Sequence, residues 1–582
     1  MTQASPAGLK GDAPGAGVPD SKGLKTGALG LVSSVVVGVA STAPAYSLAA
    51  SLGFIVASGG ALLAGTKAPG VVLLAFVPMF FIALSYQELN RAEPDCGTTF
   101  TWATRAFGSI TGWMGGWGII VADIIVMANL AQIAGSYSFT LIGEFGVPGA
   151  GDLGSFTIGG IPIWSTLAGL AWIAIMTWIC YRGIEISARL QYVLLSIEVI
   201  VLIIFAVFAL VRVYSGNAET YSIIPQWSWF NPFTLDFGRV LAPAMLTAIF
   251  IYWGWDSAVS VNEETKDPEK TPGRAAVIST LLLLATYAVV STATVAFAGV
   301  GTKGVGLGNP ANAADVFSAI GSQLFGNSFI GHILLLLLAA SILTSASASA
   351  STQTTILPTA RTALSMAVYK AIPSRFARIH PKYLTPTWST IGMGIISAAF
   401  YLIFTLVSPT LLGALIGSIG LMIAFYYGLT GFACVWFFRK TLGSSVKNFF
   451  LRGVFPFLGG AILLAVFGFG LYTFWAPDWL IANGKNVTIF GIGAVAFVGL
   501  AALLIGVVLM IIWRTLKPDF FLGKTLTRRT AELVLQGVGG RTPLLGLPDS
   551  GVEALIIAPD LSNLPPGQTA VKASGDDDTT TP

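Results

Sequence analysis

The chain is poor in charged residues, and this scarcity limits the classes of protein to which it can belong. Only 10% of its 582 residues are Asp, Glu, Lys or Arg, whereas 54% are hydrophobic. Soluble proteins carry about 25% charged residues, so a soluble multidomain chain is excluded, and a mean hydropathy of +0.78 agrees. The net charge of +4 is too small for a nucleic-acid-binding surface, so no nucleic-acid partner is expected. What remains is a polytopic membrane protein.

Cysteine and histidine are also scarce. Cys96, Cys180 and Cys434 lie far apart, so the sequence contains neither a disulfide framework nor a CxxC metal motif. Two histidines, His332 and His380, are too few for a histidine-built metal centre. The apolar stretches also lack the GxSxG and HExxH motifs of hydrolases. We therefore expect no cofactor and no enzymatic activity.

Long apolar stretches, by contrast, are abundant. A hydrocarbon core of about 30 Å is crossed by about 20 residues of helix. Twelve stretches reach that length, near 29–57, 69–89, 110–142, 162–181, 190–213, 240–262, 275–299, 329–355, 386–407, 411–438, 454–475 and 487–513. We predict an all-α membrane protein with 12 transmembrane helices, the third of which is long enough to tilt.

The positions of Lys and Arg predict the orientation, because these residues favour the cytoplasmic side. With a cytoplasmic N-terminus, five of the 31 basic residues lie on the far side: Lys67, Arg212, Arg239, Lys303 and Lys485. Residues 1–25 are predicted to be a disordered cytoplasmic tail, not a signal peptide, and 514–582 a mostly disordered cytoplasmic C-terminal tail. The expected location is the plasma membrane, with both termini inside and the lipid bilayer around the helices.

Two spans carry helix breakers near their middles. The run from Gly38 to Pro44 interrupts span 1, and the run from Phe250 to Asp256, which contains Gly254, interrupts span 6. Either break alone is consistent with a simple kink. However, span 6 crosses in the opposite direction to span 1, and such a pair of breaks is typical of inverted-repeat transporters. Opened helix ends attract carboxylates and ammonium groups, which suits an amino acid substrate.

Three carboxylates stand out inside the predicted spans, away from their ends. A charge at the bilayer centre costs at least about 2.5–3.5 kcal/mol, so such residues are functional candidates. Asp256 follows the break in span 6, Glu198 lies in span 5 and Asp123 lies in span 3. We predict these three as candidates for proton coupling. Spacings of three and four residues place Asp256, Ser260 and Glu263 or Glu264 on one helix face.

Span 8 is rich in hydroxyl side chains, which allow two interpretations. Small hydroxyl residues permit close helix packing. Alternatively, Ser345 and Ser347 are candidate Na⁺ ligands opposite the break in span 1. The aromatic residues around the break in span 6 are likewise consistent with core packing or with closure over a substrate.

Four stretches of the sequence, found in family order within residues 29–440, resemble bacterial members of the amino acid–polyamine–organocation (APC) superfamily of permeases. They are Ser85–Gly97 with Arg105–Gly108, Arg182–Gln191, Gly254–Asp256 with Glu263–Pro268, and Arg361–Ala367 with His380–Tyr383.

The resemblance implies a LeuT-like fold of five-plus-five inverted repeats. The repeats would cover about 29–213 and 240–438 within a ten-helix core at 26–440, and two peripheral helices would occupy 441–513. In similar permeases the substrate binds the unwound segments of spans 1 and 6. The residues at these positions are Ala40, Ser41, Thr42, Ala43, Phe250, Tyr252, Trp253 and Gly254. By the same resemblance, Phe250 looks like an occluding gate and Asp256 matches a position linked to proton sensing.

The chain departs from the family pattern at two positions. Many members carry Gly-Ser-Gly or Gly-Thr-Gly at the break in span 1, where this chain has Thr42-Ala43-Pro44. Proton-coupled relatives often carry a lysine in span 5 that stands in for a sodium ion, and the corresponding residue here is Glu198. A glutamate exchanges protons when burial raises its pKa, but it does not imitate a bound cation.

The function predicted from the sequence is secondary active import of an amino acid or related amine, with H⁺ as the coupling ion. Several alternatives stay open: an amino acid/amine exchanger, a polyamine importer, coupling to Na⁺, and a receptor that binds without net transport.

Overall fold

The computed structural model describes residues 22–58, 64–215, 219–313, 315–326, 328–349, 351–407, 415–479, 481–482, 485–528, 530–531 and 546–547. Its helices are α1 (Leu31–Ser41), α2 (Pro44–Ala57), α3 (Ala68–Ala92), α4 (Thr99–Phe107), α5 (Ser109–Glu144), α6 (Ala150–Ser155), α7 (Ile163–Arg182), α8 (Ile184–Tyr214), α9 (Ala242–Tyr252), α10 (Ser257–Ser260), α11 (Thr271–Ala298), α12 (Val316–Phe325), α13 (Phe329–Leu343), α14 (Ser351–Val368), α15 (Thr387–Val407), α17 (Ile416–Phe437), α18 (Val446–Asn448), α19 (Phe455–Trp475) and α20 (Ala494–Leu516). Two-residue strands form four antiparallel pairs: β1 (Thr157–Ile158) with β2 (Ile161–Pro162), β3 (Ile481–Ala482) with β4 (Lys485–Asn486), β5 (Thr488–Ile489) with β6 (Ile492–Gly493), and β7 (Thr530–Ala531) with β8 (Gly546–Leu547).

Within the described residues, 11 helices are long and apolar enough to cross a bilayer. They correspond to all of the predicted spans except 240–262, so the predicted number of 12 is not reached by this criterion. The apolar helix at that position, Phe237–Tyr252, is too short because the helix is interrupted after Tyr252. The third span is long, as predicted: α5 has 36 residues.

Both predicted breaks are confirmed. α1 ends at Ser41 and α2 begins at Pro44, with Ala43 between them in the left-handed region (φ 47°). Pro44 has no N–H to donate and its fixed φ suits a first helical residue, so it ends one helix and starts the next. α9 ends at Tyr252, and α10 follows only after Gly254, whose φ is +121°.

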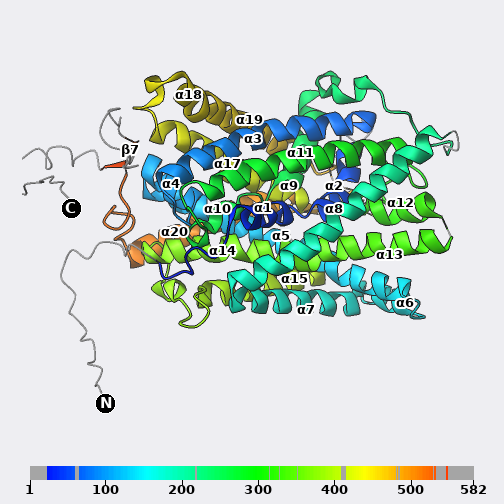
Figure 1. Ribbon diagram of the computed structural model, residues 1–582, viewed down its shortest axis with the longest axis horizontal. Coiled ribbons are helices and arrows are strands. Elements are labelled where there is room, and N and C mark those ends of the chain that lie inside the picture. The colour runs from blue at the N-terminus through cyan, green and yellow to red at the C-terminus, as the bar shows by residue number, and fades with distance from the viewer. Residues whose placement is uncertain are drawn as a thin grey trace, which may run out of the picture.

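The broken helices lie at the centre of the bundle (Figure 1). α1 contacts α10 and α11, α2 contacts α9, and α5 and α14 contact each other beside them. α7 runs along the lower edge of the view and α19 along the upper edge. The interrupted segments are thus enclosed by protein, which satisfies their backbone where lipid would not.

The part of span 6 that follows the break differs from the prediction that Asp256, Ser260 and Glu263 or Glu264 share one helix face. α10 ends at Ser260, and a single 3₁₀ turn, Asn262–Glu264, follows it. The acidic side chains of this turn form ion pairs with basic residues of other segments, and these pairs replace the predicted face.

Span 8 also departs from a regular helix. α13 passes into a π-helical turn, Thr344–Ser349, before α14 begins at Ser351. Such turns are frequent at functional sites. The turn contains Ser345, and it lies against α8, α2 and α5.

α1 begins and α20 ends on the same side of the bundle, which we call the tail side. Just after α20, Phe520 and Leu526 are buried against Phe100 and Tyr369. The backbone carbonyl of Thr527 accepts a hydrogen bond from Arg105 (2.9 Å). The part of the predicted C-terminal tail up to residue 528 is therefore packed on the bundle. Residues 1–21 and most of 529–582 lie outside the described residues.

Candidate substrate-binding site

A small cavity lies between the two breaks. Its own side chains nearly fill it and leave about 20 Å³, room for about one water molecule. Its lining residues come from the two breaks and from α1, α2, α5, α9, α10, α14 and α17. They are Ser41, Thr42, Tyr46, Ser47, Ile119, Asp123, Val126, Phe250, Trp253, Gly254, Asp256, Ser257, Thr355, Pro358 and Tyr426.

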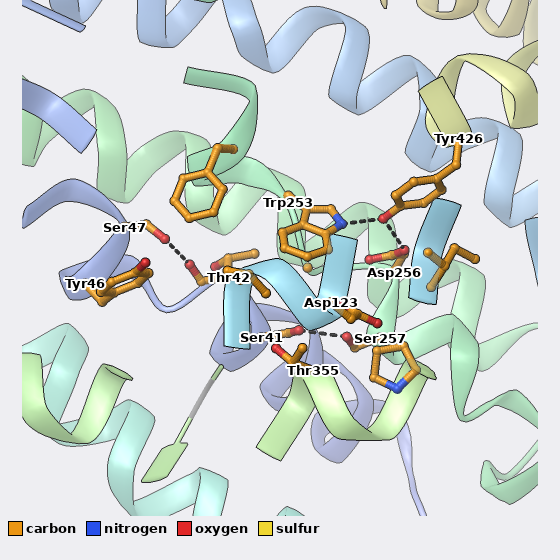
Figure 2. Close-up of a pocket in the computed structure, with 15 residues that line it drawn as sticks. Ser41, Thr42, Tyr46, Ser47, Asp123, Trp253, Asp256, Ser257, Thr355 and Tyr426 are labelled. Carbon is orange, nitrogen blue, oxygen red and sulfur yellow. Dashed lines mark hydrogen bonds between the residues drawn. The ribbon is translucent and has the colours of Figure 1, made fainter. Parts of the chain in front are cut away.

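The two breaks touch each other at one edge of the cavity. The hydroxyl oxygens of Ser41 and Ser257 are 2.7 Å apart (Figure 2). A Cβ atom on Gly254 would lie 2.6 Å from the carbonyl oxygen of Ser41. Glycine is therefore required at this position both for its positive φ and for the close approach of the two backbones.

An aromatic residue links the second break to a carboxylate. The indole N–H of Trp253 donates a hydrogen bond to the hydroxyl of Tyr426, which in turn donates to Oδ2 of Asp256 at 3.2 Å (Figure 2). Tyr426 comes from α17, about 170 residues further along the chain, and holds the Asp256 side chain at the cavity wall.

A second carboxylate faces the cavity from α5. Asp123 is 2% exposed and accepts a hydrogen bond from the hydroxyl of Thr359 on α14. Among the lining residues that the structure describes there is no Lys, Arg or His. The cavity wall is therefore acidic, with Asp123 and Asp256 as its ionisable groups.

Aromatic rings close the cavity on the side away from the tails. The rings of Tyr46 and Phe250 meet edge to face, with centroids 6.3 Å apart. The Tyr46 hydroxyl donates to the side-chain oxygen of Asn129, and the Ser47 hydroxyl donates to the backbone carbonyl of Thr42 (2.5 Å). Phe250, the predicted gate residue, thus lines the cavity and packs against Tyr46 of α2.

Glu198 binds directly to the start of α2. Its Oε1 accepts hydrogen bonds from the backbone N–H of Ala45 and from the hydroxyl of Ser345, both at 2.7 Å. The Ser345 hydroxyl also accepts from the backbone N–H of Tyr46 (3.1 Å). A carboxylate at a helix N-terminus is favoured by the free N–H groups and by the helix dipole. Glu198 and Ser345 act together on the break in span 1.

The cavity collects most, but not all, of the residues predicted from the sequence. Ser41, Thr42, Phe250, Trp253, Gly254, Asp256 and Asp123 line it, whereas Ala40, Ala43, Tyr252, Glu198 and Ser345 do not. Tyr252 points away, and its ring packs against Phe76 and Tyr287. The side chain of Ser347 lies outside the described residues.

Eight lining residues were not predicted from the sequence: Tyr46, Ser47, Ile119, Val126, Ser257, Thr355, Pro358 and Tyr426. Ser257, Tyr46 and Ser47 lie within four residues of a break, so extending the two candidate segments by one helical turn would have included them. Thr355, Pro358 and Tyr426 come from distant spans, and no local pattern marks them.

Buried ion pairs close the tail side of the cavity. Both Arg361 on α14 and Glu264 after α10 are fully buried, and they form two parallel hydrogen bonds of 2.9 Å. The backbones of Leu29 and Thr265 form a parallel bridge next to this pair. The segment that precedes α1 and the segment that follows α10 are thus joined to each other and to α14.

A second cluster lies beside the first, around Lys22. Its ammonium group contacts Oδ2 of Asp95 (2.8 Å) and Oε1 of Glu263 (2.6 Å), and its nitrogen is 3.6 Å from Sγ of Cys96. Asp95, Cys96 and Glu263 are spaced as metal ligands would be. Because the Lys22 ammonium lies among them, this cluster is satisfied by the chain's own cation.

The charges of this cluster stabilise one another. Burial disfavours the charged amine, but the carboxylates of Asp95 and Glu263 hold the pKa of Lys22 well above its usual value. Burial likewise opposes ionisation of Asp95, yet the Lys22 charge lowers the pKa of that carboxyl. Burial also raises the pKa of the Cys96 thiol, and Glu263 adds to this effect.

A membrane-spanning bundle with two opposed broken helices around a small internal cavity lined by two carboxylates defines a class of proteins, the membrane transporters of the LeuT fold. Residues 29–497 match the family model described as "Amino acid permease". The chain therefore belongs to the amino acid permease family.

Individual relatives agree with this assignment. The chain is 26% identical over 366 residues to the branched-chain amino acid permease BcaP of Bacillus subtilis, covering 60% of this chain and 71% of that protein. It is 26% identical to an arginine/ornithine antiporter of Latilactobacillus sakei, covering 59% and 67%. It is also 24% identical to the methylthioribose transporter of Bacillus subtilis, covering 60% and 71%.

The fold is similar to that of MhsT in complex with L-phenylalanine, with a TM-score of 0.55. The match covers 75% of this chain and 98% of that chain at 15% sequence identity, so it concerns the fold alone. The predicted LeuT-like architecture with broken helices in spans 1 and 6 is confirmed. The fold and the relatives belong to transporters and not to enzymes.

Proposed function

We propose that this permease is a secondary active transporter that imports an amino acid or a related amine across the plasma membrane by proton symport. The observation that carries the proposal is the meeting of the two broken helices, Ser41 against Gly254 and Ser257, at an enclosed cavity with two carboxylates. Unwound backbone and buried acids are costly in a membrane, and a substrate site explains both.

The cavity is closed on its tail side, as alternating access requires of a transporter whose site opens to one side of the membrane at a time. Release toward the cytoplasm requires α1 and α10 to separate from α14, which breaks the pair between Arg361 and Glu264. In the proposed orientation both tails are cytoplasmic, so this pair and the Lys22 cluster form the inner gate. Substrate drives the cycle only by binding one conformation more tightly than another.

Proton coupling is assigned to the carboxylates of the cavity. Asp256 contacts Tyr426 at the cavity wall, and Asp123 lines the same cavity from α5. Each carboxylate becomes neutral on binding a proton, and a neutral carboxyl group costs less free energy to bury than a charged one. The protonated site can therefore pass through a closed state as it switches from one side of the membrane to the other. Glu198, the third candidate predicted from the sequence, lies at the start of α2, where the two hydrogen bonds that its Oε1 accepts favour the charged form. The coupling proton is therefore assigned to Asp123 and Asp256.

Exchange is the second candidate function, supported by the similarity to an arginine/ornithine antiporter. An exchanger would swap an amino acid for an amine derived from it. Coupling to Na⁺ has less support, because the hydroxyl of Ser345, a predicted Na⁺ ligand, is engaged on both sides. Its oxygen accepts from the backbone N–H of Tyr46, and its hydrogen is donated to Glu198.

Uptake into proteoliposomes tests these alternatives. The purified full chain is reconstituted, and labelled amino acids and amines are supplied under an imposed pH gradient or an imposed Na⁺ gradient, each separately. Symport predicts accumulation with the pH gradient alone. Strong stimulation by preloaded unlabelled substrate, without a requirement for a gradient, would instead establish exchange. Binding without uptake under every condition would favour a receptor.

A further inference from the structure

The start of α2 has no backbone N–H available for a substrate carboxylate. Residue 44 is proline, which has none. The N–H of Ala45 donates to Glu198, that of Tyr46 to Ser345, and that of Ser47 to the carbonyl of Ala43. The two residues before the proline are also engaged, Thr42 with the carbonyl of Val39 and Ala43 with the carbonyl of Ala40. Every amide from 42 to 47 is therefore used within the chain.

Glu198 supplies the negative charge that such a helix start attracts. Its Oε1 accepts two hydrogen bonds, and the carboxylate lies at the N-terminus of a 14-residue helix. The positive end of the α2 dipole is thereby compensated by a side chain of the protein. This glutamate comes from α8, 153 positions along the chain, and it is fully buried.

The other helix ends at the cavity favour a cation. α1 ends at Ser41 and α9 ends at Tyr252, and neither has a basic residue in its last turn. The C-terminal end of a helix carries partial negative charge. At the second break Asp256 stands directly before α10. Neither C-terminal end has a basic residue in its last turn, although carbonyls there accept hydrogen bonds from within the chain. At the restarting segments, Glu198 is bonded to α2, and Asp256 precedes α10 without a capping hydrogen bond.

The cavity wall adds to this field. Asp123 and Asp256 line it, they are 2% and 4% exposed, and none of the described lining residues is basic. A substrate carboxylate placed here would lose its hydration and would find the α2 amides occupied. It would also face a like charge whenever Asp123 or Asp256 is ionised. An ammonium group would face carboxylates and the negative ends of two helices.

We propose that Glu198 is a resident anion that takes the place of a substrate carboxylate at α2, so that the site selects an organic amine cation that carries no carboxylate. This inference rests on the proposed transport function and narrows its substrate class. Glu198 is the specificity-determining residue, and it acts on the substrate through the α2 helix end, without lining the cavity itself.

Matched pairs of ligands that differ only in the carboxylate test the proposal. The probes are ornithine with putrescine, lysine with cadaverine, leucine with isopentylamine, and phenylalanine with phenethylamine, measured by competition and by uptake in proteoliposomes of the full chain. We expect the amine of at least one pair to bind about tenfold or more tightly than its amino acid, because removing a like charge from a buried site is worth at least that factor.

The variant Glu198→Gln tests the residue itself. It keeps the size of the side chain and an oxygen that accepts hydrogen bonds but removes the charge, so the preference for amines should fall about tenfold. The matched control is Glu185→Gln, a carboxylate at the exposed start of the same helix, paired with Lys25. This control should keep the wild-type preference. The ratio between paired ligands is insensitive to a general loss of folded protein.

The outcomes separate the two proposals. If amino acids are transported and every amine partner binds equally well or more weakly, the resident-anion proposal is wrong while the transport function stands. If Glu198→Gln keeps the wild-type ratio, Glu198 does not set specificity and the proposal is also overturned. If no member of the panel is bound or transported, the proposed function fails and this inference fails with it.

Discussion

The hydroxyl groups of Ser41 and Ser257 lie 2.7 Å apart, although 216 positions separate these residues in the sequence. The contact joins the end of α1 to the start of α10, so it connects the two interrupted helices at the cavity between the breaks. Motion of either half-helix must therefore break this contact or move the other half-helix with it.

Gly254→Ala should weaken substrate binding about tenfold or more. The new Cβ would lie 2.6 Å from the Ser41 carbonyl oxygen and would force a non-glycine residue into a φ of +121°. Such strain costs about 1–3 kcal/mol. Gly468→Ala in α19 is the control, since a Cβ there meets nothing within 4 Å. Equal affinity of both variants for substrate in a binding assay would show that the two breaks need not approach so closely.

Asp256→Asn should retain substrate binding and lose the pH dependence of uptake. The amide keeps the hydrogen-bonding position next to Tyr426 but neither gains nor releases a proton. Initial uptake rates are compared across a series of external pH values. Asp152→Asn, in the exposed helix α6, is the control and should behave as wild type. If the Asp256 variant kept the wild-type pH profile, its role in proton coupling would be wrong.

Lys22→Met should open the tail side, because it leaves Asp95 and Glu263 buried together without their cation. The measurement is the rate at which a water-soluble thiol reagent labels the buried Cys96, in a background where Cys180 and Cys434 are replaced by alanine. Labelling should accelerate. Lys25→Met is the matched control, since Lys25 and its partner Glu185 are each 44% exposed; an equal effect of both variants would contradict the prediction.

The effect of Lys22→Met should not depend on pH in the neutral range. A raised pKa of Lys22 gives stabilisation that is complete below the unfolded value of about 10.4 and lost only above the folded value. A lowered pKa of Asp95 gives stabilisation that is complete above about 3.9 and lost as the pH falls through the folded value. The ratio of labelling rates, variant to wild type, should therefore be the same at about pH 6 and about pH 8.

Arg361→Ala should destabilise the protein by about 3–5 kcal/mol, since it leaves the Glu264 carboxylate buried and unpaired. Arg361→Lys should recover little, because a single ammonium cannot make the two parallel hydrogen bonds of the guanidinium. The double variant Arg361→Met with Glu264→Gln should be more stable than Arg361→Ala. Thermal unfolding in detergent gives the order. An unfolding temperature of Arg361→Ala equal to that of the wild type would show that the pair does not stabilise the fold.

Much of the architecture follows from local sequence. The apolar stretches are long enough to fix the crossings, and Pro44 and Gly254 mark the breaks because their backbone chemistry ends a helix wherever they stand. Ser41, Thr42, Trp253 and Asp256 reach the cavity because they lie at those breaks. Tyr252 was misplaced by the same reasoning, since proximity to a break does not set the direction in which a side chain points.

The sequence by itself determined that this chain is a bundle of membrane helices with two opposed interruptions, because length, hydropathy and helix breakers act over a few neighbouring residues. Only the tertiary structure decided that Glu198 caps α2, that Tyr426 holds Asp256 and that Lys22 fills an acidic cluster. Each of these contacts joins residues at least 70 positions apart. Such partners are chosen by the packing of whole helices, which no local periodicity encodes.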